Sequence, residues 1–152
     1  MNDSGPGTGR TTGVRRGEPG DLPHLRRMQA AALAEPAPDL LRAAAVEGPP
    51  TLFVADDGEP VGYAVLVAGA VAYLPELAVA PACQGEGVGT ALLDAVVADL
   101  RGREGGPDRL RVTARAGDSR ARRFYESRGF DVLERLPDFF ESGEGVAMVR
   151  DL

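Results

Sequence analysis

The segment ACQGEGVGTALL (residues 82–93) places glycine at alternate positions, Gly85, Gly87 and Gly89, between an apolar run and an expected helix. Backbone N–H groups at the start of a helix point toward an anion, and glycine lets that backbone approach it closely. The spacing therefore predicts a phosphate-binding loop. Loops of this kind serve nucleotide hydrolases, dinucleotide-binding folds and enzymes that use coenzyme A.

The rest of the sequence conflicts with the first two of these classes. The loop of nucleotide hydrolases needs a lysine on the terminal phosphates, and all 17 basic residues of this chain are arginine. The dinucleotide fingerprint G-x-G-x-x-G has Thr90 or Leu92 where its third glycine would stand. That fold also needs several more parallel strands, and only about sixty residues follow the loop, read as one parallel strand and a hairpin. Coenzyme A is the ligand that fits best.

Two motifs carry a family resemblance. Gln84-Gly85-Glu86-Gly87-Val88-Gly89 resembles the [QR]-x-x-G-x-[GA] signature of the GNAT superfamily, the acyl-CoA-dependent N-acyltransferases. Downstream, DSRARRFYESRGF (118–130) resembles the family segment N-x-x-A-x-x-[FL]-Y-x-x-x-G-F. Between them the separation fits one helix and one strand. The resemblance covers roughly residues 13–152 in element order and is motif-specific over 73–130.

The resemblance implies a binding site for acetyl-CoA as co-substrate, without a metal. The segment YLPELAVAP (73–81) is similar to the family strand that pairs with the pantetheine arm of the coenzyme. A backbone N–H near Val79, at an expected bulge where the fourth and fifth strands part, is implied to polarise the thioester carbonyl. The residues implied to bind the coenzyme are Leu77, Ala78, Val79, Gln84, Gly85, Glu86, Gly87, Val88, Gly89, Thr90 and Asp118.

Tyr125 and Asp118 come from the second motif. In the family, the tyrosine at the position of Tyr125 protonates the departing thiolate of coenzyme A, and a phenol suits this role because it stays protonated at neutral pH. The alternative is that Phe124 and Tyr125 are two core aromatic residues of a short amphipathic helix. Asp118 stands where the family usually has Asn, so it can cap that helix but offers no N–H donor to the coenzyme.

Glu76 is the candidate for the amine side of the reaction. It is expected on the fourth strand, where many relatives have an acidic residue facing the substrate. A carboxylate there could accept the proton of the amine through water, or hold the amine electrostatically. Other relatives have a glutamate on the following strand, where this chain has Thr113. The alternative is an exposed strand glutamate without a role.

The hydrophobic pattern predicts the framework that positions these residues. Apolar residues at helical or alternating spacing, interrupted by Gly and Pro, give the order β-α-α-β-β-β-α-β-α-β-β. Asp21 is the expected N-cap of the first helix, Asp57-Gly58 predicts a hairpin turn, and the strand, helix and strand around the glycine loop predict a right-handed parallel crossover. The expected elements lie near 13–16, 21–35, 38–48, 51–69 (two strands), 70–81, 87–103, 109–113, 118–129, 130–136 and 145–150.

This order and the resemblance together predict an α/β (α+β) fold of the GNAT type. We expect a mixed, mostly antiparallel sheet of six or seven strands flanked by about four helices. A length of 152 residues with 43% hydrophobic content fits one domain. The polar segment 1–12 is expected to be a disordered tail, and residues 13–152 the acetyltransferase domain.

Charge and cysteine content exclude other classes. A net charge of -6 argues against a general nucleic-acid binder, which needs a basic face. The apolar run after Tyr63 is too short to span a bilayer, so no membrane partner is expected. Cys83 is the only cysteine, so an internal disulfide is impossible, and a reducing, cytoplasmic location is expected.

The sequence thus predicts an N-acetyltransferase in which an amine attacks acetyl-CoA directly in a ternary complex. The closing segment LPDFFESGEGVAMVRDL (136–152) resembles that of ribosomal-protein-alanine N-acetyltransferases, but Phe139 and Phe140 stand where tyrosines are common. The acceptor is therefore left open between a small amine and a protein N-terminus or lysine. Two alternatives also stay open: a coenzyme-binding module or sensor with reduced catalysis, and an interaction protein in which the loop is only a turn. Because dimers are common in the family that the chain resembles, a homodimer is possible.

Overall fold

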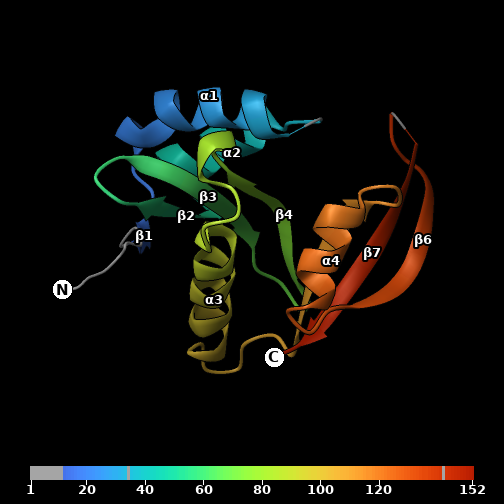
Figure 1. Cartoon of the computed structure of the whole chain (residues 1–152). Helices are drawn as coiled ribbons and strands as arrows, with labels where there is room; N and C mark the ends of the chain where they lie inside the picture. Colours follow the sequence, from blue (N-terminus) through green and yellow to red (C-terminus); the bar gives the residue numbers. More distant parts are fainter. Residues whose placement is uncertain (1–11, 34, 142) are drawn as a thin grey trace. The chain divides into compact units, whose positions relative to one another are not determined.

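The computed structural model describes residues 12–33, 35–141 and 143–152. Over this part of the chain, seven strands and four α-helices follow one another in the predicted order, with 3-10 turns at Pro19–Asp21 and Pro81–Cys83 (Figure 1). The residues group into two compact units. Unit 1 comprises the chain up to Leu66 together with Glu76–Ala98, and unit 2 comprises Val67–Pro75 and Asp99–Leu152.

Unit 1 holds the antiparallel strands β1 (Gly13–Arg16), β2 (Thr51–Asp56) and β3 (Pro60–Val67), the last of these up to Leu66, and the helices α1 (Leu22–Ala32) and α2 (Pro38–Val46). The predicted hairpin at Asp57-Gly58 is confirmed, with Gly58 at a φ of +121°. Gly48 follows α2 at a φ of +56° and donates its N–H to the carbonyl of Ala43. The core of the unit joins both helices to the strands through Leu25, Met28, Leu41, Ala44, Ala45, Leu52, Val54, Tyr63, Val65 and Ala78.

Strand β4 (Ala72–Val79) contributes to both units, because the division between them falls after Pro75. In unit 2 its first residues, Ala72 to Leu74, pair in parallel with Leu110 to Val112 of β5 (Arg109–Arg115). The pairing ends before Pro75, which has no N–H to donate to a ladder. Helix α3 (Val88–Arg101) lies between β4 and β5 in the chain, so the predicted parallel connection is confirmed.

The remainder of unit 2 is α4 (Ser119–Glu126) and the antiparallel hairpin of β6 (Asp131–Phe140) and β7 (Gly143–Asp151). Both closing strands extend further toward their turn than the sequence predicted. Phe139 and Phe140, expected in a loop, belong to β6. Their rings lie edge to face, with the ring centroids 4.9 Å apart. Phe140 pairs with Gly143 and lies under the Arg115 guanidinium, which explains the extra length of the hairpin.

The strand order is β1-β2-β3-β4-β5-β7-β6. Among the pairs whose register is described, β1–β2, β2–β3, β5–β7 and β6–β7 are antiparallel, and β4–β5 is parallel. The predicted mixed, mostly antiparallel fold is confirmed. Among the described residues, no helix has the length and apolar character needed to cross a membrane. Of the predicted tail 1–12, only Thr12 lies within the described residues, and the single domain 13–152 stays a prediction.

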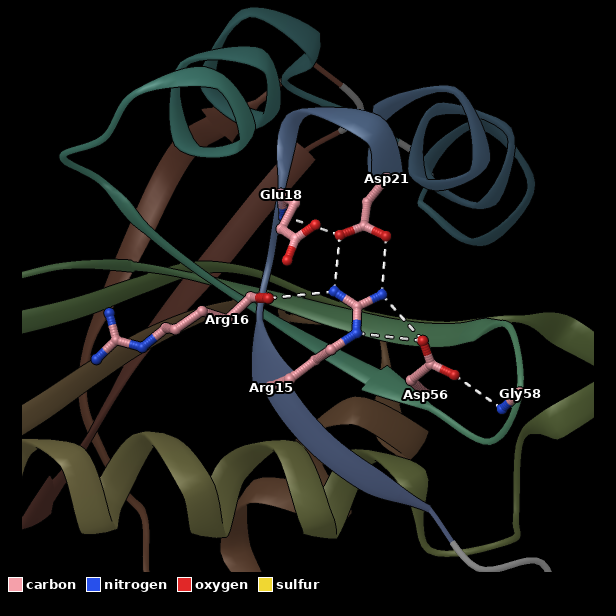
Figure 2. A network of polar contacts seen from close by, with 6 residues as sticks. All are labelled: Arg15, Arg16, Glu18, Asp21, Asp56 and Gly58. Atoms are coloured by element: carbon pink, nitrogen blue, oxygen red, sulfur yellow. Dashed lines mark hydrogen bonds and ion pairs between the residues drawn. The ribbon is translucent and has the colours of Figure 1, made fainter.

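A charged network fixes the start of unit 1 (Figure 2). The Arg15 guanidinium donates two 2.8 Å hydrogen bonds to the carboxylate of Asp21, and others of 2.9 and 3.2 Å to Asp56 beside the hairpin. Asp21 also accepts the N–H of Glu18. Asp21 occupies the N-cap position of α1, as predicted, but its side chain accepts no hydrogen bond from that helix, because it is committed to Arg15 and Glu18.

We predict that Arg15→Lys lowers the free energy of unfolding by about 1 kcal/mol at pH 7, because an ammonium cannot reproduce the planar fork between two carboxylates. The hydrogen bond from Arg15 lowers the pKa of Asp21. A carboxyl with a lowered pKa stabilises the fold above its unfolded value and loses that contribution as pH falls through the folded value. The difference between variant and wild type should therefore shrink below about pH 4.

Urea unfolding at several pH values measures this effect. Arg26→Lys, at an exposed position of α1, is the control and should stay within about 0.5 kcal/mol of the wild type. A deficit for Arg15→Lys that persists unchanged at pH 3 would contradict the carboxylate explanation.

Candidate active site

The glycine loop of unit 1 adopts a backbone that requires glycine. Gly85 and Gly87 have φ angles of +83° and +85°, in the left-handed region, and a Cβ at either would meet no atom within 4 Å. Residues Gln84 to Gly87 form an exposed turn. The carbonyl of Gly87 accepts the N–H of Ala91, which begins the hydrogen-bond ladder of α3. The glycines are therefore used for backbone conformation in front of a helix, and not for close packing.

The loop is tied at both ends within unit 1. The Gln84 side chain donates to the carbonyl of Val79 at 3.3 Å, and Val88, the first residue of α3, is 2% exposed. A Cβ at Gly62 of β3 would lie 2.8 Å from Val88 Cγ1 and 3.0 Å from the Ala78 carbonyl. The missing side chain of Gly62 thus lets the start of α3 approach the sheet closely.

This geometry fits a phosphate bound by backbone N–H groups. The first N–H groups of a helix have no partner within the helix, and the helix dipole favours an anion there. Around the loop, Leu77, Val79, Gly89 and Thr90 are half-buried, while Ala78 and Val88 are buried. Side chains of the buried residues therefore serve the core, and any contact that they make to a coenzyme would come from their backbone.

Glu76 lies on the buried face of β4. Ala72, Leu74, Glu76 and Ala78 are buried, and the residues between them are half-buried. Glu76 is only 5% exposed, so the alternative of an exposed glutamate is wrong. The alternation in AYLPELAV already placed Glu76 in phase with apolar residues, which is the sequence signal that could have shown its burial.

The Glu76 carboxylate accepts three hydrogen bonds of 2.8 Å. Gln29 Nε2 and the Tyr63 hydroxyl donate to Oε1, and the backbone N–H of Ala37 donates to Oε2. Burial, together with the negative charge of Glu76, raises the pKa of Tyr63 well above its usual value. Tyr63 therefore remains a donor. The predicted role of Glu76 as base or amine anchor stays a hypothesis.

Tyr125 belongs to unit 2 and is 8% exposed. Its ring lies edge to face against Phe124 and Phe130, with ring centroids 5.3 Å apart in both pairs. Burial raises its pKa well above 10, and the nearby ionisable groups of Asp118 and Tyr73 raise it further. The side chain is thus both a core aromatic and a phenol that stays protonated through the neutral range.

Asp118 caps α4, as predicted. Its Oδ1 accepts the N–H of Ala121 at 3.0 Å, while its carbonyl accepts that of Arg122. Gly129, at a φ of +89°, follows the end of the helix. The contact of Asp118 with a coenzyme remains a prediction.

Tyr73 is a residue that the sequence analysis did not single out. Its hydroxyl lies 3.2 Å from Thr113 Oγ1, on the neighbouring strand of unit 2. Thr113, which stands where other relatives have a glutamate, forms a hydroxyl pair with Tyr73. Both residues are half-buried. The signal for Tyr73 was its place on the opposite face of β4 from Glu76.

Metal ligands do not cluster in the described ranges: no group of three or more His, Cys, Asp or Glu side chains there could hold a metal ion. Cys83 is buried, with 6% of its surface exposed.

Comparisons with known proteins give a consistent picture. Residues 22–130 match the model of the acetyltransferase (GNAT) family. A sequence search against curated proteins gave no match. Among solved structures, Ard1 from Thermoplasma volcanium is 27% identical, with a TM-score of 0.81 over 93% of this chain and 97% of that one.

Two further structures share the fold. The ribosomal-protein-S18-alanine N-acetyltransferase from Escherichia coli is 24% identical, with a TM-score of 0.80 over 93% of this chain and 94% of that one. Arabidopsis thaliana NAA60, solved in complex with acetyl-CoA, is 17% identical, with a TM-score of 0.82 over 93% and 100%. At these identities the likeness concerns the fold.

We predict that Gly62→Ala destabilises unit 1 by about 1–3 kcal/mol, because the added methyl overlaps the stiff Val88 side chain and touches the Ala78 carbonyl. Urea unfolding measures the loss. Gly13→Ala in β1 is the control, because its Cβ would meet nothing within 4 Å, and it should be neutral or stabilising. Equal stability of the two variants would contradict the close approach at Gly62.

Proposed function

Because the chain belongs to the acetyltransferase (GNAT) family, and is therefore an acyltransferase, we propose that it transfers an acetyl group from acetyl-CoA to a primary amine. The observation that carries this proposal is the exposed turn at the start of α3, where Gly85 and Gly87 are held in the left-handed region. A backbone of this kind suits a phosphate and has no need of a lysine, which this chain lacks. Acetyl-CoA is the acyl donor that a family member uses by default.

The loop and β4 supply the proposed donor site. Backbone N–H groups of the segment 84–90 bind the pyrophosphate, and Leu77 to Val79 pair with the pantetheine arm. The N–H of Val79 donates to the thioester carbonyl and stabilises the charge that develops on its oxygen. Supporting this assignment, the side chain of Gln84 already ties the loop to the Val79 carbonyl.

The proposed reaction is direct transfer. The amine nitrogen forms a bond to the acetyl carbon, the carbon–sulfur bond breaks, and its electron pair stays on sulfur. Tyr125 gives its phenolic proton to that sulfur, while the nitrogen loses a proton to a base or to water. The products are an N-acetyl amine and free coenzyme A. Burial and a raised pKa support Tyr125 as a group that is protonated before transfer.

The proposed acceptor is a primary amine, named by its chemical class alone. The Escherichia coli structure is that of an enzyme named for an alanine of ribosomal protein S18. In this chain the hairpin that follows α4 carries Phe139 and Phe140, which have no hydroxyl to bind a peptide backbone. A panel of peptides, polyamines, amino acids and aminoglycosides therefore covers the relevant classes.

Acetyl-CoA should stabilise the protein against thermal unfolding. At a hundredfold excess over its dissociation constant it should add about 2.7 kcal/mol, and free thiol should accumulate with at least one amine of the panel. Gly87→Ala is the matched variant, because an alanine at a φ of +85° costs about 1–2 kcal/mol and distorts the turn. It should lose most of the ligand-dependent stabilisation.

Two results would count against this function. Binding without thiol release across the panel would indicate a coenzyme-binding module or sensor. No stabilisation of the wild type by acetyl-CoA would indicate that the loop is only a turn.

We predict that Tyr125→Phe lowers kcat by about 100-fold or more, as expected for loss of a general acid, with little change in stabilisation by acetyl-CoA. The raised pKa of Tyr125 means that the required protonated form persists above pH 10. Deprotonation of Tyr125 should therefore cause no fall in wild-type kcat below pH 10. Tyr125→Phe should lower kcat without removing any feature of the pH–kcat profile in that range. Full turnover by the variant at every pH would exclude the acid role.

A further inference from the structure

Unit 1 contains an unusual buried charge. Glu76 and Gln29 are the two buried polar or charged side chains among the described residues, 5% and 3% exposed, and they are hydrogen-bonded to each other. Removing a carboxylate from water costs several kcal/mol unless hydrogen bonds replace the lost hydration. The buried carboxylate of Glu76 therefore needs hydrogen-bond donors from the protein, whereas water would hydrate an exposed carboxylate.

The three donors to Glu76 come from three separate parts of unit 1. Gln29 lies on α1, Tyr63 on β3, and Ala37 directly before α2. Each bond measures 2.8 Å, and both carboxylate oxygens are used. One side chain of β4 thereby connects both helices to the sheet.

The partners of Glu76 are matched to a group that accepts hydrogen bonds. The backbone N–H of Ala37 can only donate, and Tyr63 is kept in its donor form by burial and by the charge of Glu76. A buried donor left without an acceptor costs about 1–3 kcal/mol. Movement of the Glu76 side chain away from these three donors is therefore opposed by its own contacts.

The next residues of β4 are those proposed to meet the donor thioester. Side chains alternate, so Glu76 and Ala78 face the core while Leu77 and Val79 face the other way. At the far end of this segment, the N–H of Ala80 donates to the Val61 carbonyl at 2.9 Å. The segment Leu77 to Val79 is thus held between the carboxylate of Glu76 and the backbone of β3.

We propose that Glu76 is a positioning residue and not the base: it holds β4 at Leu77 to Val79 against α1, the start of α2 and β3, and so sets the direction of the Val79 N–H. The effect of this positioning on catalysis rests on the proposed function, because the Val79 N–H is the proposed contact of the thioester carbonyl. The proton of the amine then leaves by another route.

Two variants test this inference. Glu76→Gln keeps the shape but presents an NH2 group to donors, and Tyr63→Phe removes one donor while leaving the Glu76 side chain itself unchanged. Amide hydrogen exchange of the ligand-free protein gives a readout independent of activity. Exchange at Ala37 and at residues 77–79 should accelerate by about tenfold in both variants. Tyr73→Phe is the matched control, because it removes a phenol outside this network, and exchange at Ala37 should not change.

Kinetics separate positioning from proton transfer. A positioning role predicts that both variants raise KM for acetyl-CoA by up to about tenfold, with a smaller effect on kcat and no shift of the acid limb of the pH–kcat profile. Because the two residues share one hydrogen bond, the double variant should lose less than the sum of the single losses. If Glu76→Gln does not fold, Tyr63→Phe carries the same test alone.

Two outcomes overturn the inference. A loss of kcat by 10²–10⁴-fold in Glu76→Gln, together with loss of the acid limb and a normal Tyr63→Phe, would identify Glu76 as the base and leave the proposed function intact. Unchanged exchange at Ala37 and 77–79 in both variants would also overturn it. Absence of acetyl-CoA binding or thiol release in the wild type would instead count against the proposed function, while the exchange result still decides the structural role.

Discussion

A carboxylate placed in a protein core must regain the hydrogen bonds that it had in water, and Glu76 meets that requirement with donors from α1, β3 and the residue before α2. Much of unit 1 depends on this arrangement. A hydrophobic cluster packs both helices against the strands, yet apolar packing has little directional preference. Three hydrogen bonds to one carboxylate add direction, since each bond limits the distance and angle between donor and acceptor. The burial of Glu76 therefore specifies how both helices meet the sheet.

The segment that follows Glu76 is the proposed contact of the thioester, and its backbone is held on both sides. Backbone groups, unlike side chains, can be aimed only by fixing the chain on both sides. Here β4 is fixed by Glu76 before the segment and by the Ala80 to Val61 hydrogen bond after it. Beyond this, Gly85 and Gly87 turn the chain into α3, and the bare backbone of Gly62 lets Val88 approach the sheet. A site made of N–H groups needs such precision more than it needs particular side chains.

In unit 2 the candidate residues are side chains that also have a structural role. Tyr125 combines a place among aromatic rings with a phenol whose pKa is raised by burial and by its neighbours. The structural and chemical interpretations of this tyrosine are therefore compatible, because the burial that makes it a core residue also keeps its proton in place. Asp118 likewise caps α4 whether or not it touches a coenzyme. Thr113 and Tyr73 add a hydroxyl pair on the adjacent strands.

By itself the sequence determined the order of the elements, the glycine loop before α3, the cap of α4 and the membership of the family, because each depends on local backbone preferences or on a short motif. It did not show that the side chain of Asp21 bonds Arg15 instead of the first helix, and it made the closing hairpin too short, because the contact of Phe140 with Arg115 joins different strands. Only the tertiary structure decided the environment of Glu76. The alternation of β4 predicts that its side chain points inward, but its three donors lie 13 to 47 residues away in the chain. No local pattern encodes a contact that exists only after α1, α2 and β3 have packed together.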